Sequence, residues 1–395
     1  MAKRTGGFIG QDGINAPDQA TGVTGTAGDG QVDVSFTSPS DVGGAAITEY
    51  RVTDSTGAHG ATGSASPITV SGLTNGTSYT FNVWAINPFG WSSPSDASGS
   101  VTPVNPITST MAWLIGRVTP IDAYNIASTG NAIDYGDMTQ NESNLAASAN
   151  TTQALISGFG YASNSTIDKL DLTSLGNTAS FGNLTQSSQQ GSGVSNSTRA
   201  VHSIGYTSGA AASNSIEYMT FGTSGNGTDF GDLTSTFNIG CGSGSSTRGL
   251  FGGVAFNSKS NVINYITIAS AGNATDFGDL TVARNGLAAC SSTTRSIQFG
   301  GDTTSDSYSN IIDYVTIAST GNATDFGDLS VGARYLGGSG STTRGTIAGG
   351  DASTGDTNRI EYVTIASTGN GTDFGDLTED RKSCSGFSNC HGGLS

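Results

Sequence analysis

One short phrase returns six times in this chain, and its spacing limits what the chain can fold into. In its clearest form it reads Thr-Asp-Phe-Gly-Asp-Leu-Thr, at 228–234. Measured on the last apolar residue of each copy, the gaps are 46, 49, 47, 49 and 48 residues. A repeat of this length is typical of an array of similar structural units. The six marker residues are Met138, Leu184, Leu233, Leu280, Leu329 and Leu377.

Each repeat contains segments that read as four strands. An alternating apolar run such as 312–317, rich in β-branched and aromatic residues, predicts a half-buried strand. Ser-Thr-Gly-Asn at 319–322 follows it and favours a hairpin turn, so the phrase itself is the next strand. A run ending in two glycines (344–350) stands upstream, and a small-residue run (284–290) follows the phrase. Four strands in about 48 residues predict one blade of a β-propeller; a parallel β-solenoid is the alternative.

The number of blades follows from the incomplete units at the two ends of the repeat region. The first half-repeat, at 113–116, lacks the small-residue strand that should precede it, whereas 383–389 supplies a surplus one. A ring closes if this last strand completes the first blade, which removes exposed strand edges. We therefore expect an all-β chain whose residues 105–395 form six blades.

The order of these segments resembles the kelch repeat. Both have an arginine, a small-residue strand, an apolar strand ending in Gly-Gly, a strand with an acidic residue and tyrosine, and a strand with an aromatic residue and leucine. The kelch family usually has tryptophan where this chain has Asp-Phe. The phenylalanines can fill the same space between neighbouring blades; they are Phe230, Phe277, Phe326 and Phe374.

Residues 19–104 predict a separate antiparallel sandwich. Runs at 32–36, 47–52 and 79–87 alternate with period two and have turn residues between them. This segment resembles a fibronectin type III domain, with Phe36 where that family normally has tryptophan. The prolines after it, Pro103 and Pro106, predict a short stiff linker. The residues that match the tyrosine corner of the family are Leu73, Gly76, Thr77 and Tyr79.

Residues 1–18 are glycine-rich and contain one apolar pair, Phe8 and Ile9. Such a segment cannot bury enough apolar surface to fold alone. It is therefore either a frayed terminus or an arm that becomes ordered when those two residues anchor it on a larger assembly. No apolar run has the length of a signal peptide or a membrane span, so we expect neither export nor membrane insertion.

Composition argues against several classes of partner. The formal charge of −16 repels phosphate backbones, so we expect no nucleic-acid binding. The four cysteines have no CxxC spacing, and we expect buried free thiols, with a bridge between Cys384 and Cys390 as the alternative.

Two features of the repeat could bind ligands. The Asp-x-x-Asp of the phrase, for example Asp229 and Asp232, could supply oxygens to calcium, but positions i and i+3 of a strand point to opposite faces. We expect turn and inter-blade hydrogen bonds instead. An arginine also recurs in register, and its ring could hold an anion, although pairing with the repeat carboxylates is the preferred interpretation. These arginines are Arg199, Arg248, Arg295 and Arg344.

Nothing in the sequence points to catalysis. The only histidines, His59, His202 and His391, stand in different contexts, and no nucleophile motif or clustered carboxylate pair occurs. Some kelch-type propellers are copper sugar oxidases, but the spaced histidines of that site are missing. We therefore predict no enzyme, no cofactor and no metal.

The whole pattern resembles virion proteins of tailed bacteriophages, particularly cyanophages, in which an arm worded like 6–17 leads to a fibronectin-like domain and then to repeats worded Gly-Asn-Ala-Thr-Asp-Phe-Gly-Asp-Leu. The resemblance implies a non-enzymatic tail or fibre protein, assembled in the host cytoplasm, whose arm binds other virion proteins. A homo-oligomer on the particle is compatible with it. A decoration protein without receptor role and a lectin-like or carbohydrate-active propeller are the alternatives.

The inter-strand loops that follow the glycine pairs differ between repeats although their frames agree. Divergent loops on a uniform scaffold are where binding is expected, here to a host-surface glycan or protein; the alternative is unselected surface. The candidate receptor-facing residues are Tyr206, Phe256, Asp302, Tyr308, Asp351 and Asp356.

Overall fold

The computed structural model describes residues 15–28, 30–75, 77–103, 110–140, 143, 145–159, 164–208, 211–253, 258–303 and 307–394. The chain divides into two compact units, Met1–Pro106 and Ile107–Ser395. Each unit consists of antiparallel sheets, so the protein is all-β, with a small N-terminal domain followed by several small sheets. The predicted anchor residues Phe8 and Ile9 lie outside the described residues.

The first unit is a sandwich of two sheets that enclose one apolar core. The period-two alternation of its strands puts every second side chain inside. Phe36, at the position where a tryptophan was expected, packs its ring 4.8 Å from that of Tyr50. One sheet has the order β1-β2-β5 (Thr21–Gly28, Gln31–Thr37, Ile68–Ser71), and the other β4-β3-β6-β7 (Gly60–Gly63, Glu49–Asp54, Phe81–Asn87, Gly90–Trp91).

The predicted tyrosine corner is present in the first unit. The backbone N–H of Thr74 donates to the hydroxyl oxygen of Tyr79 over 3.1 Å. This bond ties the segment before β6 back to the turn that precedes it, as in sandwiches of this kind.

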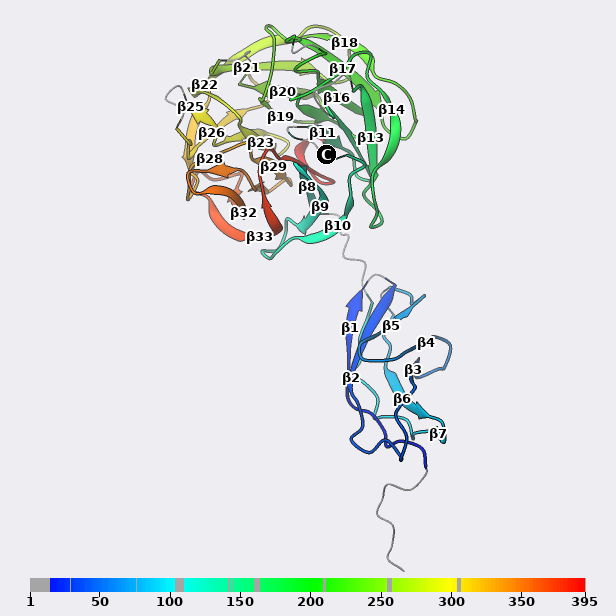
Figure 1. The fold of residues 1–395 in the computed structure, drawn as a ribbon. Coiled ribbons are helices and arrows are strands. Elements are labelled where there is room, and N and C mark those ends of the chain that lie inside the picture. Colours follow the sequence, from blue (N-terminus) through cyan, green and yellow to red (C-terminus); the bar gives the residue numbers. More distant parts are fainter. Residues whose placement is uncertain are drawn as a thin grey trace, which may run out of the picture. The chain divides into compact units, whose positions relative to one another are not determined.

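The described residues of the second unit form six antiparallel sheets, which we number in chain order (Figure 1). Their core strands are β34, β8, β9 and β10 (Ser385–Ser388, Met111–Gly116, Val118–Asn125, Ile133–Asp137) in sheet 1; β11 to β14 (Ala146–Ala149, Gln153–Ser157, Thr166–Asp171, Ala179–Asn183) in sheet 2; and β15 to β18 (Gly193–Ser195, Arg199–Ser203, Ser215–Thr220, Thr228–Asp232) in sheet 3. Sheet 4 has β19 to β22 (Cys241–Gly244, Arg248–Gly252, Ser260–Thr267, Thr275–Asn285); sheet 5 has β23, β24, β26 and β27 (Ala288–Ser291, Arg295–Phe299, Ile311–Thr316, Thr324–Asp328); and sheet 6 has β29, β30, β32 and β33 (Gly337–Gly340, Arg344–Ala348, Gly355–Thr364, Thr372–Arg381). Three two-residue strands, β25 (Asp302–Thr303), β28 (Ala333–Arg334) and β31 (Asp351–Ala352), lie at the edges of sheets 4 and 6.

The six sheets form a closed cycle of contacts. The small-residue strand of each sheet contacts that of the next, from β11 through β15, β19, β23 and β29 to β34, and β34 contacts β11. Figure 1 shows these strands toward the middle of the unit. The last strand, β34, pairs with β8, with Ser385 opposite Ile115 and Ser388 opposite Ala112. The expected pairing of the last strand with the first half-repeat is therefore confirmed.

The backbone of the repeated phrase forms hydrogen bonds with the hairpin of the next sheet. Between sheets 4 and 5, the Gly321 N–H donates to the Phe277 carbonyl (2.8 Å), and the Asp279 N–H donates to the Asn322 side chain (3.1 Å). The glycine of the phrase, Gly278, has φ +145°, and a Cβ there would collide with the Gly321 carbonyl. The same bonds join Phe374 to Gly130 (2.9 Å) and so link sheet 6 to sheet 1.

Candidate functional site

The divergent connections all lie at one end of the second unit. In an antiparallel sheet, the connection between the second and third strands is at the same end as the exit of the fourth strand. We call this the loop end; in sheet 6 it holds 349–354. The Ser-Thr-Gly-Asn hairpins, such as 365–371, lie at the opposite end, which we call the hairpin end.

Three successive sheets are joined at the loop end by a cluster of charged side chains around Arg334. The Arg334 guanidinium lies 3.1 Å from the Asp351 carboxylate through Nε and 3.0 Å from Asp302 through Nη1. Lys259, from the connection of sheet 4, lies 2.9 Å from the same Asp302 oxygen. The Arg334 Cζ is 5.0 Å from the centre of the Tyr308 ring, which is a cation–π contact. Three of the predicted receptor-facing residues, Asp302, Tyr308 and Asp351, are thus brought together.

The cluster is electrostatically balanced at its base and partly buried. Only 5% of the Asp302 side chain is exposed, and its Oδ1 has no hydrogen-bond partner among the described residues. Burial opposes the charge of Arg334, but its hydrogen bonds with Asp351 and Asp302 outweigh this and raise its pKa. The arginine is therefore permanently charged and fixed between the two loops.

The other predicted loop residues do not take part in these contacts, although Asp356 is paired with Asp351 across β31 and β32. Asp356 pairs with Lys382 (2.8 Å) and with Arg117 (3.7 Å), which joins sheet 6 to sheet 1. Tyr206 lies in sheet 3, where its hydroxyl accepts a hydrogen bond from Asn238 (3.2 Å). Phe256 lies outside the described residues.

Arg334 and Lys259 were not singled out from the sequence, although Arg334 holds the cluster together. A signal for it exists in the repeat. The equivalent positions, counted from the marker leucines, carry the neutral residues Gln189, Asn238 and Asn285 in three repeats. The last repeat carries a second cation, Lys382, at this position, so the last two repeats depart from the neutral residues of the three before them.

Strained backbone surrounds the centre of the loop end. Gln190, Ile239 and Tyr335, which precede the small-residue strands of their sheets, have φ between +52° and +58°. Backbone hydrogen bonds link this position from sheet to sheet: Ile239 donates to Gln190 (3.1 Å), and Tyr335 donates to Gly286 (2.7 Å). Left-handed conformations of residues other than glycine cost free energy and persist only when the surrounding structure imposes them. Here a backbone hydrogen bond from the neighbouring sheet fixes the turn that precedes each of these small-residue strands.

The recurring arginines do not pair with the repeat carboxylates, and that prediction is wrong. Arg199 stacks its guanidinium 4.3 Å from the centre of the Tyr218 ring and donates to the Ile268 carbonyl of the next sheet (2.9 Å). The reason is geometric: each arginine stands opposite a tyrosine-bearing strand, with carbonyls of the next hairpin within reach. The same pair forms in three more sheets, by Arg248 with Tyr265, Arg295 with Tyr314, and Arg344 with Tyr362.

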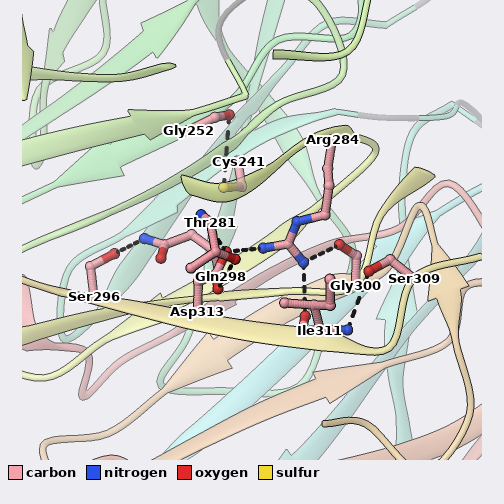
Figure 2. Close-up of polar contacts among 10 residues, drawn as sticks. All are labelled: Cys241, Gly252, Thr281, Arg284, Ser296, Gln298, Gly300, Ser309, Ile311 and Asp313. Atoms are coloured by element: carbon pink, nitrogen blue, oxygen red, sulfur yellow. Dashed lines mark hydrogen bonds and ion pairs between the residues drawn. The ribbon is translucent and has the colours of Figure 1, made fainter. Parts of the chain in front are cut away.

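A buried carboxylate joins neighbouring sheets instead (Figure 2). Between sheets 4 and 5, Asp313 accepts from the Thr281 hydroxyl (2.6 Å) and pairs with Arg284 (2.5 Å), and both charged side chains are fully buried. Arg284 also donates to the carbonyls of Gly300 (2.7 Å) and Ile311 (2.8 Å). The network is structural, because both charged side chains in it are removed from solvent.

The expected inter-blade hydrogen bonds of the Asp-x-x-Asp phrase are formed by its backbone and not by its carboxylates, as the Asp279 N–H shows.

In the part of the chain that the structure describes, no three His, Cys, Asp or Glu side chains form a group that could hold a metal ion. No helix of the described residues has the length and apolar character needed to cross a membrane.

All four cysteines are free, in agreement with the preferred interpretation. Burial raises the pKa of Cys241 and Cys384 to about 12, so these thiols are unreactive at neutral pH. Burial also lowers the pKa of His391, whose Nε2 lies 2.8 Å from the Ala149 carbonyl at the hairpin end.

Comparison with known proteins identifies only the first unit. No curated protein matches this chain. The fibronectin type III domain family matches residues 16–101, which is the two-sheet sandwich with the Tyr79 corner. The chain therefore carries a fibronectin type III domain at its N-terminal side, followed by the sheets of the second unit.

Proposed function

We propose that the second unit is a six-bladed kelch-like β-propeller in a virion surface protein of a tailed phage. In this proposal the protein is not an enzyme and sits on the tail or a fibre. The loop end contributes to attachment to the host surface, and the segment before the sandwich binds other virion proteins. The cyclic contacts from β11 to β34 support the propeller assignment. The wording of the repeat supports the phage assignment.

One observation carries the attachment role. Connections that differ in sequence from sheet to sheet are held together at their bases by Arg334, Asp302 and Asp351. When the strands of a repeat stay the same and its loops differ in sequence, the differing residues lie on the surface, where a partner can contact them. The ion pairs fix the bases of these loops, which lowers the entropy lost when a partner binds.

The location is tested by immunogold electron microscopy of purified particles with antibody against residues 105–395. Label at the tail or fibre tips is expected. Uniform label over the head would replace attachment by decoration, and the absence of label from intact particles would overturn the virion assignment in favour of a lectin-like or carbohydrate-active protein.

The attachment role is tested by competition. Purified chain should slow adsorption of the phage to its host, and a Tyr308→Ala, Arg334→Ala variant should lose this effect. Asp325→Asn, in the exposed phrase of sheet 5, is the matched control and should compete like the original chain. Equal competition by the loop variant and the control would overturn the assignment of attachment to these loops.

A further inference from the structure

Sheet 2 departs from sheets 3 to 6 at one surface groove. The groove has a volume of about 440 Å³ and is lined by residues of β12, β13, β14 and the hairpin between the last two. Four other sheets fill the equivalent place with an arginine stacked on a tyrosine, such as Arg199 on Tyr218. In sheet 2 these two positions carry Gln153 and Lys169. The stacked pair is missing, and the space that it would cover is open.

Two more positions of the groove break the repeat. Asp171 stands where the other four sheets have threonine, as at Thr220, and Ala179 stands where they have threonine, as at Thr228. The alanine removes bulk beside Lys169, with which it is paired across β13 and β14. The departures therefore enlarge the groove and change its chemistry at once.

Hydrogen bonds hold three of the lining side chains in place and leave their remaining polar atoms available to a ligand. The Gln153 Oε1 accepts from the Gly222 N–H (3.0 Å), so its amide nitrogen can donate. The Asn177 Oδ1 accepts from the Asp137 N–H (2.9 Å), which leaves a second amide donor. The Asp171 Oδ1 accepts from the N–H (2.8 Å) and the hydroxyl (2.6 Å) of Thr173, and its Oδ2 remains an acceptor.

Lys169 adds a charged donor. Its ammonium forms no ion pair with any described residue, although the chain has a formal charge of −16. A volume of this size falls in the range of small-molecule sites, roughly 300–1,000 Å³. Several fixed donors beside one carboxylate acceptor match neighbouring hydroxyl groups, each of which both donates and accepts.

We propose that this groove binds a neutral saccharide through a pair of adjacent hydroxyls, which Lys169 and Asp171 contact, while Gln153 and Asn177 donate to the remaining ring oxygens. The groove lies at the hairpin end of sheet 2, opposite to the divergent loops, so the proposal does not rest on the proposed attachment role. The lining contains no aromatic side chain for the sugar ring to stack on. Binding is therefore expected in the millimolar range, about −4 kcal/mol.

Saturation-transfer NMR on the full chain tests the proposal with glucose, galactose, mannose, fucose and N-acetylglucosamine, each titrated to ~50 mM, well above a millimolar Kd. Saturable transfer to at least one sugar is expected. The variant Gln153→Arg, Lys169→Tyr restores the pair of the other four sheets, so it should fold and fill the groove, and its affinity should fall ~10-fold or more, which corresponds to about 1.4 kcal/mol.

Two further variants make the outcome decisive. Asp171→Asn removes the carboxylate and should weaken binding, whereas the Tyr308→Ala, Arg334→Ala variant at the loop end should leave saccharide binding unchanged even where it no longer slows adsorption of the phage. Absence of saturable transfer for every sugar, or equal transfer to the original chain and the filled variant, would overturn the proposal.

Discussion

At two junctions between neighbouring sheets, a threonine hydroxyl donates to a carboxylate of the next sheet, but only one of the two carboxylates is paired with a cation. Between sheets 4 and 5, the Thr281 hydroxyl donates to Asp313, and Arg284 neutralises the carboxylate. Between sheets 2 and 3, the Thr185 hydroxyl donates to Glu217 over 2.5 Å, and no cation pairs with this carboxylate among the described residues. The residue beside Glu217 on the neighbouring strand is His202, which is fully buried between Ser148 and Ser157.

The difference shows two ways of closing a ring of similar sheets. At the charged junction, a buried ion pair balances itself, and it depends on both partners being present. At the junction of sheets 2 and 3, burial favours the uncharged forms: it raises the pKa of Glu217 and lowers that of His202 to about 3. The first junction is therefore sensitive to mutation, and the second to pH.

Removal of the cation from the charged junction should have the largest effect. Arg284→Met leaves Asp313 buried without its partner and the carbonyls of Gly300 and Ile311 without their donor. The free energy of unfolding should fall by about 3–5 kcal/mol, as for other broken buried pairs. Urea denaturation at pH 7 measures it. The double variant Arg284→Met, Asp313→Asn should recover part of the loss; a double variant no more stable than the single one would show that the ion pair is not the source.

Acid should weaken the other junction. Unfolded His202 titrates near its ordinary pKa of 6.5, whereas the buried side chain stays neutral down to about pH 3. Its stabilising contribution is complete above pH 6.5 and is lost as the pH falls, by about 2 kcal/mol between pH 7 and pH 5. His202→Gln should remove this part of the pH dependence. Denaturation curves of the original chain and of the variant, each at pH 7 and pH 5, measure this difference. An equal loss of the free energy of unfolding in both proteins would contradict the assignment to His202.

Glu217 should respond in the opposite direction. Its pKa is higher in the folded chain than the ordinary 4.5, so folding is most favoured when the group is protonated and stability falls as the pH rises above 4.5. Glu217→Gln should therefore stabilise the fold at pH 7 by about 1 kcal/mol, with the gain shrinking toward pH 4.5. Asn264 already accepts the hydroxyl bond at the equivalent position of sheet 4. A gain that does not depend on pH would contradict this account.

The smallest effect is expected at an arginine that stacks on a tyrosine. Arg248→Gln removes the contact with Tyr265 (4.9 Å to the ring centre) and the bond to the Ile317 carbonyl (2.9 Å). Because the side chain is only partly buried, the loss should be about 0.5–1 kcal/mol. A loss as large as that of Arg284→Met would mean that the two arginines act alike, and the distinction between them would fail.

Much of the architecture could be predicted from the sequence because its signals are local and repeated six times. The strand alternation at 312–317, the Gly-Asn turns and the surplus strand at 383–389 predicted β26, the hairpin between β26 and β27 and the pairing of β34 with β8. The arginine partners could not be predicted in this way. Arg199 and Arg284 both lie in the repeat region, but which acceptor each one reaches depends on the neighbouring sheet.

The candidate site was predicted in part. The loop residues Asp302, Tyr308 and Asp351 were selected because their segments differ between repeats, and the structure places them around one arginine. Tyr206 came from the same pattern but lies in sheet 3. Asp356 is paired with Asp351 in sheet 6, but its carboxylate contacts Lys382 and Arg117 instead of Arg334.

The sequence by itself determined the number of repeated units, the strands within each unit and the fibronectin type III domain, predicted at 19–104 and matched at 16–101, since alternation, turn residues and period act over short distances. Only the tertiary structure decided which charges meet. Arg284 and Asp313 stand 29 residues apart, and Arg381 pairs with Asp122 although 259 residues separate them. Whether a buried group is ionised or neutral depends on the side chains that the fold brings beside it. The same side chains decide whether a polar group is covered or lines a groove.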